Sequence, residues 1–395
     1  MMGFNNKWMQ ALQERDCLRL VFPERISSTN AAEIRGEVVE LLSHFPYSEL
    51  IADFDRVDYI SSSGLRVILE LIKKEKNFRI VQVASSVYEI FEMTGFLQMA
   101  DIRKKRRRVS LENAEEIGWG FTARVYRLTE DSIIKVYRES VTIEEIEMEL
   151  NRAKQAFIAG IPTAISYDIV DVENSIGVIF ERMDGGTLQS AMLAHPERFD
   201  ELMEQYARVL QAINSTPVSD EAIPDAKELA LQKLKYLTEE KELLSPQEAE
   251  RMEKLLRSLP DTGTYIHGDC QFKNIMLSGG EPMLIDMDTL SKGSPLFELA
   301  ALYYCYIVFE EVFPGNSEEF FGVPCELTER ITERLMEKCL PVYSAEPFER
   351  AENKVHLLGW FIFLHFVAQY MPEREEGIKK AAELFRKQLS EFEME

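Results

Sequence analysis

The sequence lacks any apolar run that would clearly cross a bilayer. Two apolar stretches stand out, 299–309 and 355–370, and both are shorter than the ~20 residues that a membrane-spanning helix needs. The second stretch also contains His356, His365 and Gln369. We therefore expect no membrane span and predict that both stretches are buried helices.

Cysteine is also scarce, and its spacing excludes two classes of small domain. The five cysteines show neither a C-x-x-C motif nor paired metal-ligand spacing: Cys17, Cys270, Cys305, Cys325 and Cys339. This argues against a structural zinc site and against a disulfide framework. With no signal peptide recognisable, we expect reduced thiols and a cytoplasmic location.

Basic residues are outnumbered, with 45 Lys and Arg against 68 Asp and Glu and a net charge of -23. This balance argues against nucleic acid as a partner, because phosphate backbones require basic surfaces. It suits a cationic small molecule, although an acidic surface is also a common route to solubility. The 395 residues, 46% of them hydrophobic, predict a soluble globular chain of two or three domains.

Residues 1–105 predict a first, small domain. Apolar strand patterns at 18–22, 50–54 and 78–83 alternate with helix patterns after 30, 62 and 86. This alternation indicates an α/β domain with a largely parallel sheet. Asn30, with Glu33 three residues later, predicts the N-terminal cap of the first helix.

The segment 15–102 resembles a STAS domain, the fold of bacterial anti-sigma-factor antagonists. The resemblance is strongest at 60–65, which reads ISSSGL where that family usually has Asp-Ser-Ser/Thr-Gly-Leu after the first position. It implies a protein partner and makes Ser62 the candidate phosphoacceptor, with Ser61 in place of the Asp. The alternative is that Ser62 and Ser63 only cap the helix.

A basic run, 103–108, follows this domain directly. Such runs bind anionic lipid or nucleic acid in other proteins. In so acidic a chain, we interpret the run as a solvated linker that pairs with acidic surface, and we place a domain boundary here.

The strongest chemical signal lies at 267–288. Residues 267–274 have the form H-x-D-x-x-x-x-N, and Asp286 follows a second apolar segment. Phosphoryl transfer needs one carboxylate, here Asp269, to accept or orient the proton of the attacking hydroxyl. It also needs oxygen ligands for Mg²⁺, here Asn274 and Asp286. The apolar segments 275–277 and 283–285 flank a Gly-rich turn, which predicts a hairpin that holds Asn274 and Asp286 side by side.

Upstream lie the elements expected of a nucleotide site. Gly118 and Gly120 fall in a predicted hairpin turn, where glycine lets the backbone approach phosphates. Lys135 is the single cation of the apolar strand 133–137 and is expected to hold the α- and β-phosphates. A buried Lys needs an acidic partner; Glu149 on the following helix fits best, with Glu145 and Glu147 left open.

Residues 110–390 resemble the aminoglycoside phosphotransferase and choline kinase group of the protein-kinase-like fold. The resemblance implies a two-lobed α+β domain with a nucleotide-binding N-lobe at 109–185 and a mostly helical C-lobe at 186–395. Gly268 stands where protein kinases usually carry Arg, which points to the small-molecule branch. The implied cofactors are ATP (or GTP) and Mg²⁺.

Further site residues follow from the same resemblance. The backbone of 181–183, with Glu181 and Met183 at its ends, is the expected adenine-binding hinge. Asp288 is a candidate for a place near metal or substrate. Lys273, next to Asn274, is also a candidate for such a place, where it would approach a phosphate; the alternative is that it points to solvent. In the stretch 293–300, Glu298 replaces the family's usual Asp at a structural position.

Two functions remain open at this point. The first is an ATP- and Mg²⁺-dependent phosphotransferase acting on a hydroxyl of a small, aminoglycoside- or choline-like molecule, with a regulatory STAS domain. The second is a partner-switching regulator whose kinase-like domain binds nucleotide or modifies the STAS domain.

Overall fold

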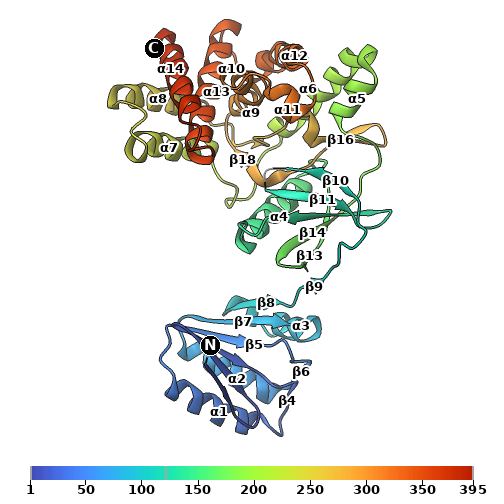
Figure 1. Cartoon of the computed structure of the whole chain (residues 1–395), viewed down its shortest axis with the longest axis vertical. Helices are drawn as coiled ribbons and strands as arrows, with labels where there is room; N and C mark the ends of the chain where they lie inside the picture. Colours follow the sequence, from blue (N-terminus) through green and yellow to red (C-terminus); the bar gives the residue numbers. More distant parts are fainter. Residues whose placement is uncertain (1, 121, 394–395) are drawn as a thin grey trace. The chain divides into compact units, whose positions relative to one another are not determined.

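The computed structural model describes residues 2–120 and 122–393 (Figure 1). Phe121, in the predicted glycine-containing turn, lies outside them. The chain forms two compact units: Met1–Ser110 with Ile169–Glu173, and Leu111–Asp168 with Asn174–Glu395. Each unit has its own hydrophobic core.

The first unit is built on a mixed sheet in the order β1-β2-β3-β5-β7-β8. Strands β3 (Cys17–Val21), β5 (Glu49–Asp53), β7 (Phe78–Val83) and β8 (Asp101–Lys104) pair in parallel. Strands β1 (Met2–Asn5) and β2 (Gln10–Glu14) add an antiparallel hairpin. The prediction of a largely parallel α/β domain is confirmed, but this hairpin was missed.

Helices α1 (Ala31–His44), α2 (Ser62–Lys74) and α3 (Ser85–Met93) join these strands. The predicted capping of α1 is wrong in its detail. The Asn30 side chain accepts a hydrogen bond from the Ser27 N–H, and Glu33 binds Lys7 and Trp8. Asn30 is the capping residue by position only, because its amide is used within the preceding turn.

The backbone at the start of helix α2 packs closely against core side chains. The Ser61 hydroxyl accepts a hydrogen bond from the Gly64 N–H at 3.2 Å, so Ser61 caps the helix. Capping by Ser62 or Ser63 is therefore wrong, and Ser62 is an exposed first residue of α2. A Cβ on Gly64 would lie 2.7 Å from Ile26 Cγ2 and 2.8 Å from Ile60 Cγ1, which excludes any larger residue there.

The basic run pairs with acidic residues, as interpreted, but it is not a solvated linker throughout. Its first residues belong to β8, where Ile102 packs into the core and holds Arg103 and Lys104 in the sheet. Arg106 then pairs with Asp171 at 2.6 Å. Strand β9 (Arg107–Arg108) pairs in parallel with β13 (Ser166–Val172). Backbone pairing and acidic partners together order the run.

A second sheet has the order β10-β11-β12-β14-β13-β9. Strand β12 (Ser132–Tyr137) lies between β11 (Ala123–Arg127) and β14 (Ser175–Glu181), with β10 (Glu116–Trp119) beyond β11. Helix α4 (Ile143–Ile158) follows β12 and opens with a capping box between Thr142 and Glu145. Glu145 is thereby committed to the helix start.

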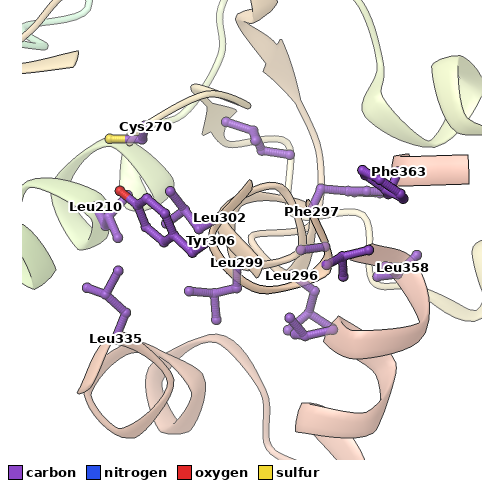
Figure 2. Packing of buried hydrophobic residues seen from close by; sticks show 14 of the residues in the cluster. Leu210, Cys270, Leu296, Phe297, Leu299, Leu302, Tyr306, Leu335, Leu358 and Phe363 are labelled. Carbon is purple, nitrogen blue, oxygen red and sulfur yellow. The ribbon is translucent and has the colours of Figure 1, made fainter. Parts of the chain in front are cut away.

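The remainder is helical, with short strands around the candidate site. Its helices are α5 (Leu188–Ala194), α6 (Phe199–Ser215), α7 (Ala226–Lys235), α8 (Pro246–Ser258), α9 (Leu296–Tyr303), α10 (Phe309–Val312), α11 (Asn316–Phe321), α12 (Cys325–Tyr343), α13 (Phe348–Tyr370) and α14 (Glu375–Glu391). Figure 2 shows α9 at the centre of the core, with Leu302 and Tyr306 on the side of Cys270 and Leu210. No helix in the described residues is long and apolar enough to cross a membrane, and α9 and α13 are buried, as predicted.

Glu298 on α9 ties this core to the candidate site. It is fully buried and accepts hydrogen bonds from the backbone N–H groups of His267 (2.6 Å) and Gly268 (3.1 Å). The Asn214 amide lies 3.4 Å from the same carboxylate. One buried acid thus fixes the start of the 267–274 loop.

We expect each half of the chain to fold alone, because each has its own core. Separating the chain after Lys105 leaves β8 in the first fragment and keeps β9 with β13 in the second. Fragments 1–105 and 106–395 should each show a cooperative thermal transition by circular dichroism. If neither fragment melts cooperatively, the two halves depend on one another and the boundary is wrong.

We expect Glu298→Ala to lower the free energy of unfolding by about 2–4 kcal/mol, because it leaves two buried backbone donors without their acceptor. Urea unfolding of the whole chain measures this. Glu298→Gln keeps the shape and one acceptor oxygen and should cost less. The exposed Glu281→Ala should be near neutral; an equal cost for Glu281→Ala and Glu298→Ala would contradict the anchoring role.

Candidate active site

The loop 267–274 connects β15 (Tyr265–Ile266) to β16 (Ile275–Ser278) and presents Asp269. Gly268 has φ +81°, and a Cβ there would lie 3.1 Å from the Thr289 carbonyl oxygen, so the turn requires glycine. His267 is fully buried; its Nε2 is 3.0 Å from the Ile285 carbonyl, and its Nδ1 accepts from the Asp269 N–H at 3.3 Å. Both ring nitrogens are used, so His267 supports the loop and is not available as a base.

Asp269 is held by two amides. Gln271 Nε2 donates to both carboxylate oxygens, at 2.9 and 3.0 Å, and Asn274 Nδ2 donates to one of them at 2.9 Å. Burial and the nearby Asp286 nevertheless raise the pKa of Asp269 to about 7. A carboxylate tuned in this way is suited to exchanging a proton near neutral pH.

A hairpin brings Asn274 and Asp286 together, as predicted from the two apolar segments around a Gly-rich turn. Strand β16 pairs with β17 (Glu281–Leu284) around the turn Gly279–Gly280, whose φ values are +59° and +87°. The Ile285 N–H then donates to the Asn274 carbonyl at 3.0 Å. Asp286 itself has φ +66°, a left-handed conformation that is strained for a non-glycine residue and common at functional sites.

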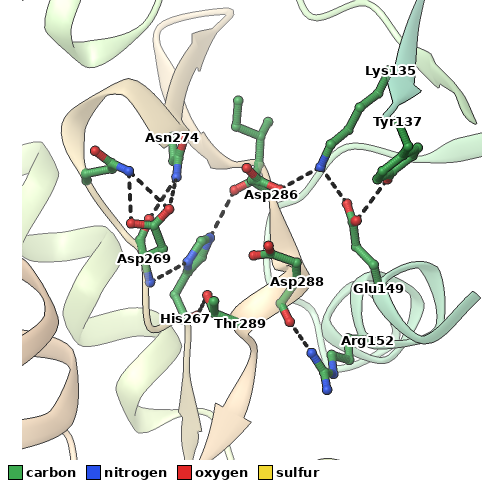
Figure 3. Close-up of polar contacts among 12 residues, drawn as sticks. Lys135, Tyr137, Glu149, Arg152, His267, Asp269, Asn274, Asp286, Asp288 and Thr289 are labelled. Atoms are coloured by element: carbon green, nitrogen blue, oxygen red, sulfur yellow. Dashed lines mark hydrogen bonds and ion pairs between the residues drawn. The ribbon is translucent and has the colours of Figure 1, made fainter. Parts of the chain in front are cut away.

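Lys135 lies between two acids (Figure 3). Its ammonium is 2.8 Å from Glu149 and 2.7 Å from Asp286, and the Tyr137 hydroxyl donates to the other oxygen of Glu149 at 2.8 Å. Burial opposes the charge of Lys135, but Asp286 and Glu149 outweigh it and raise its pKa. Of the three acids considered on α4, Glu149 is the partner observed.

In Figure 3 the Asp288 side chain lies below Asp286, between His267 and Glu149. Burial, together with the charge of Asp286, raises its pKa. Arg152, three residues after Glu149 on α4, donates to the Asp288 backbone carbonyl. Asp269, Asp286 and Asp288 thus concentrate more negative charge than Lys135 balances, which is the environment that a divalent cation stabilises.

The protein oxygens alone do not make a closed metal cage. Among the described residues, no cluster of three or more His, Cys, Asp or Glu has metal-binding geometry. In phosphoryl-transfer sites Mg²⁺ takes one or two carboxylates and completes its shell with phosphate oxygens and water. Asp286 and Asn274 fit the protein's share of such a shell.

The other residues predicted for the nucleotide site make local backbone contacts. Gly118 pairs with Val125, and the Gly120 N–H closes the β10–β11 turn on the Ala123 carbonyl at 2.8 Å. The N–H and the side chain of Glu181 are both bonded to the backbone of Ile165, and Met183 follows β14. Of Glu181, only the carbonyl is therefore a candidate for a base contact.

Gln271 and Arg152 were missed from the sequence. The only signal for Gln271 in the sequence was its position two residues after Asp269. Arg152 sits three residues after Glu149, the spacing of one helix face, and this was the only signal for it. Lys273, by contrast, was named, and its ammonium lies over the Phe320 ring.

Comparison with known proteins finds a matching family for each half of the chain. A model of the STAS domain matches residues 9–109. A putative anti-sigma factor antagonist, BtrV of Bordetella bronchiseptica, is 29% identical over 85 residues, which are 20% of this chain and 72% of that protein.

Solved structures with low sequence identity are similar to part of this chain. The ADP-bound aminoglycoside phosphotransferase APH(2'')-Ib is 15% identical, with 78% of this chain and 99% of that one covered and a TM-score of 0.48. The choline kinase LicA of Streptococcus pneumoniae is 15% identical, with coverages of 77% and 99% and a TM-score of 0.44.

The model of the phosphotransferase enzyme family matches residues 113–322, just over half of the chain, and spans every residue of the site described above. The chain belongs to the phosphotransferase enzyme family, with a STAS domain ahead of its phosphotransferase domain.

Proposed function

We propose that this protein transfers the γ-phosphoryl group of ATP, with Mg²⁺, to a hydroxyl of a small molecule, and that its STAS domain regulates this activity or binds a separate regulator. The observation that carries the proposal is the Glu149–Lys135–Asp286 set of ion pairs together with the hydrogen-bonded Asp269–Asn274 pair, with the Ile285 N–H bonded to the Asn274 carbonyl just before Asp286. Each member has the chemistry that one step of phosphoryl transfer requires.

Lys135 and the hinge would hold the nucleotide. The Lys135 ammonium is fixed by Glu149, so it can give charge to the α- and β-phosphates without reorganising. The Glu181 carbonyl and the Met183 N–H are the proposed adenine contacts, and the β10–β11 turn with Gly118 and Gly120 would cover the phosphates. The choice of ATP over GTP rests on this hinge alone, and competition between the two nucleotides tests it.

Asp286 and Asn274 would hold Mg²⁺, and Asp288 is close enough to contribute. Mg²⁺ in such a site neutralises charge on the phosphates as the phosphoryl group is transferred. Lys135 pairs with Asp286 in this structure. Binding of a nucleotide with Mg²⁺ would therefore change which groups contact the Asp286 carboxylate.

Asp269 would take the proton of the acceptor hydroxyl. Its two amide donors, Gln271 and Asn274, orient the carboxylate and leave one oxygen with a single donor. Because a base acts mainly in the transition state, its role should appear in turnover and not in nucleotide affinity.

We expect Asp269→Ala to lower the turnover number about 10²- to 10⁴-fold, the usual contribution of general base catalysis, with an unchanged dissociation constant for MgATP. Asp286→Ala should instead weaken MgATP binding. Labelled ATP with a panel of hydroxylated acceptors measures turnover, and calorimetry measures binding.

The exposed Asp261→Ala serves as the control for both variants and should behave as wild type. Thermal melts should show that each variant is folded. Wild-type turnover in Asp269→Ala would remove Asp269 as the base.

A second activity is proposed for the first unit: partner binding switched by a phosphate on Ser62. The Ser62 side chain is exposed at the first position of α2, while Ser61 does the capping. A phosphate on Ser62 would gain from the free N–H groups of the first turn and would add about -1.5 to -2 charges to that surface.

We expect phosphate on Ser62 after incubation with MgATP if the phosphotransferase domain modifies its own STAS domain. Mass spectrometry of wild type, Ser62→Ala and Asp269→Ala should find the modification in wild type alone. Phosphate at other serines but not at Ser62, in active enzyme, would assign Ser62 to a separate kinase or to no kinase.

A further inference from the structure

A second ammonium lies at the catalytic loop, away from Lys135. Lys273 is four residues after Asp269, in the turn Phe272–Asn274. Its Nζ is 3.4 Å from the centre of the Phe320 ring and 5.6 Å from that of Phe321. In the described part of the chain its observed contacts are these ring faces, whereas Lys135 contacts two carboxylates.

The two ammonium groups belong to different parts of the site. Lys135 contacts Glu149 and Asp286 (Figure 3), whereas Lys273 belongs to the loop that carries Asp269 and directly precedes Asn274. In the proposed function Lys135 and the metal ligands serve the nucleotide, which leaves Lys273 as a cation available to the acceptor.

Aromatic side chains lie around Lys273. Helix α9 continues into a π-helical turn, Tyr304–Val308, and such turns are frequent at functional sites because they displace side chains from the regular helix face. Tyr306 of this turn contacts the rings of Phe272 and Phe321, so the turn packs against the residues around Lys273. Trp119, next to Gly120, makes an edge contact with Phe320 at 6.4 Å and so joins the β10–β11 turn to α11.

We propose that Lys273 binds a negatively charged group of the acceptor, a carboxylate or a phosphate, so that the acceptor is an anionic hydroxylated small molecule and not a polyamine or quaternary amine. The proposal rests on the proposed function. Phe320 offers apolar surface for the acceptor's carbon frame, and Asp269 receives its hydroxyl.

The net charge of -23 does not outweigh this local cation. Exposed carboxylates are screened beyond about 10 Å in ordinary salt. A buried ammonium acts through protein of low dielectric constant at contact distance. A cationic acceptor group at Lys273 would therefore meet a like charge, whereas an anionic group would pair with it.

The test is direct binding, read from the fluorescence of Trp119, whose side chain is 65% exposed while that of Trp360 is buried. With Mg²⁺ and a non-hydrolysable ATP analogue present, the protein is titrated with glycerate, glycerol 3-phosphate, glycerol and choline. At least one of the two anions should bind about 10- to 100-fold more tightly than glycerol or choline, the gain of one charged hydrogen bond. Comparison of glycerate with glycerol 3-phosphate distinguishes carboxylate from phosphate.

Lys273→Met should abolish this preference and Lys273→Arg should keep much of it, with the affinity for MgATP unchanged in both. Lys241→Met is the matched control, because Lys241 also lies over an aromatic ring, 5.4 Å from the centre of Tyr236. Trp119→Phe should remove the signal.

Three results would overturn the inference: no probe binds, choline or glycerol binds as tightly as both anions, or Lys273→Met leaves anion affinity intact. An equal loss of MgATP and anion affinity in Lys273→Met would also overturn it, since Lys273 would then serve the nucleotide. Failure of the proposed function is seen separately, as wild-type protein that does not bind MgATP or does not turn over labelled ATP with any acceptor.

Discussion

The site depends on one buried ammonium shared by two carboxylates. Lys135 comes from the middle strand of the second sheet, Glu149 from α4 and Asp286 from the end of the β16–β17 hairpin. The Lys135–Glu149 pair is well buried, and removing one partner would leave an uncompensated charge that costs about 3–5 kcal/mol. The Asp286 side chain is 36% exposed, so solvent screening makes its contribution smaller. The charge balance therefore holds strand, helix and hairpin in one register, and the same balance is what a nucleotide with Mg²⁺ would meet.

A different set of contacts, made by Glu298 and His267, holds the loop 267–274. Glu298 collects the N–H groups of His267 and Gly268, and His267 bonds the Ile285 carbonyl just before Asp286. The loop and the metal segment are thus fixed to α9, the helix at the centre of the core (Figure 2). A carboxylate with a pKa near 7 needs such support, since a mobile Asp269 would become solvated and lose the effect of burial.

The sequence predicted those parts of the site whose chemistry follows from spacing. The eight residues from His267 to Asn274, the glycine turn and the single Lys of β12 each restrict the backbone or the charge so strongly that few arrangements remain. Prediction from the sequence failed where a contact joins distant segments without a periodic pattern, as for Arg152 with the Asp288 carbonyl. The β1–β2 hairpin and the ordered basic run were missed for a related reason: pairing with a neighbouring strand decides their structure, and strand preference is strongly dependent on context.

Ser61 shows how a departure from a family pattern can be physically conservative. Asp and Ser are both good capping residues because each offers a short side-chain oxygen to the N–H groups of the first helical turn. Ser61 does this for α2 through the Gly64 N–H, so the helix start needs no acid. What changes is the charge beside Ser62. Without the Asp, a phosphate on Ser62 would meet less repulsion at the helix terminus, while a partner that reads the carboxylate itself would lose its contact. The presence of Ser61 therefore leaves this surface without that carboxylate and keeps the cap of α2 intact.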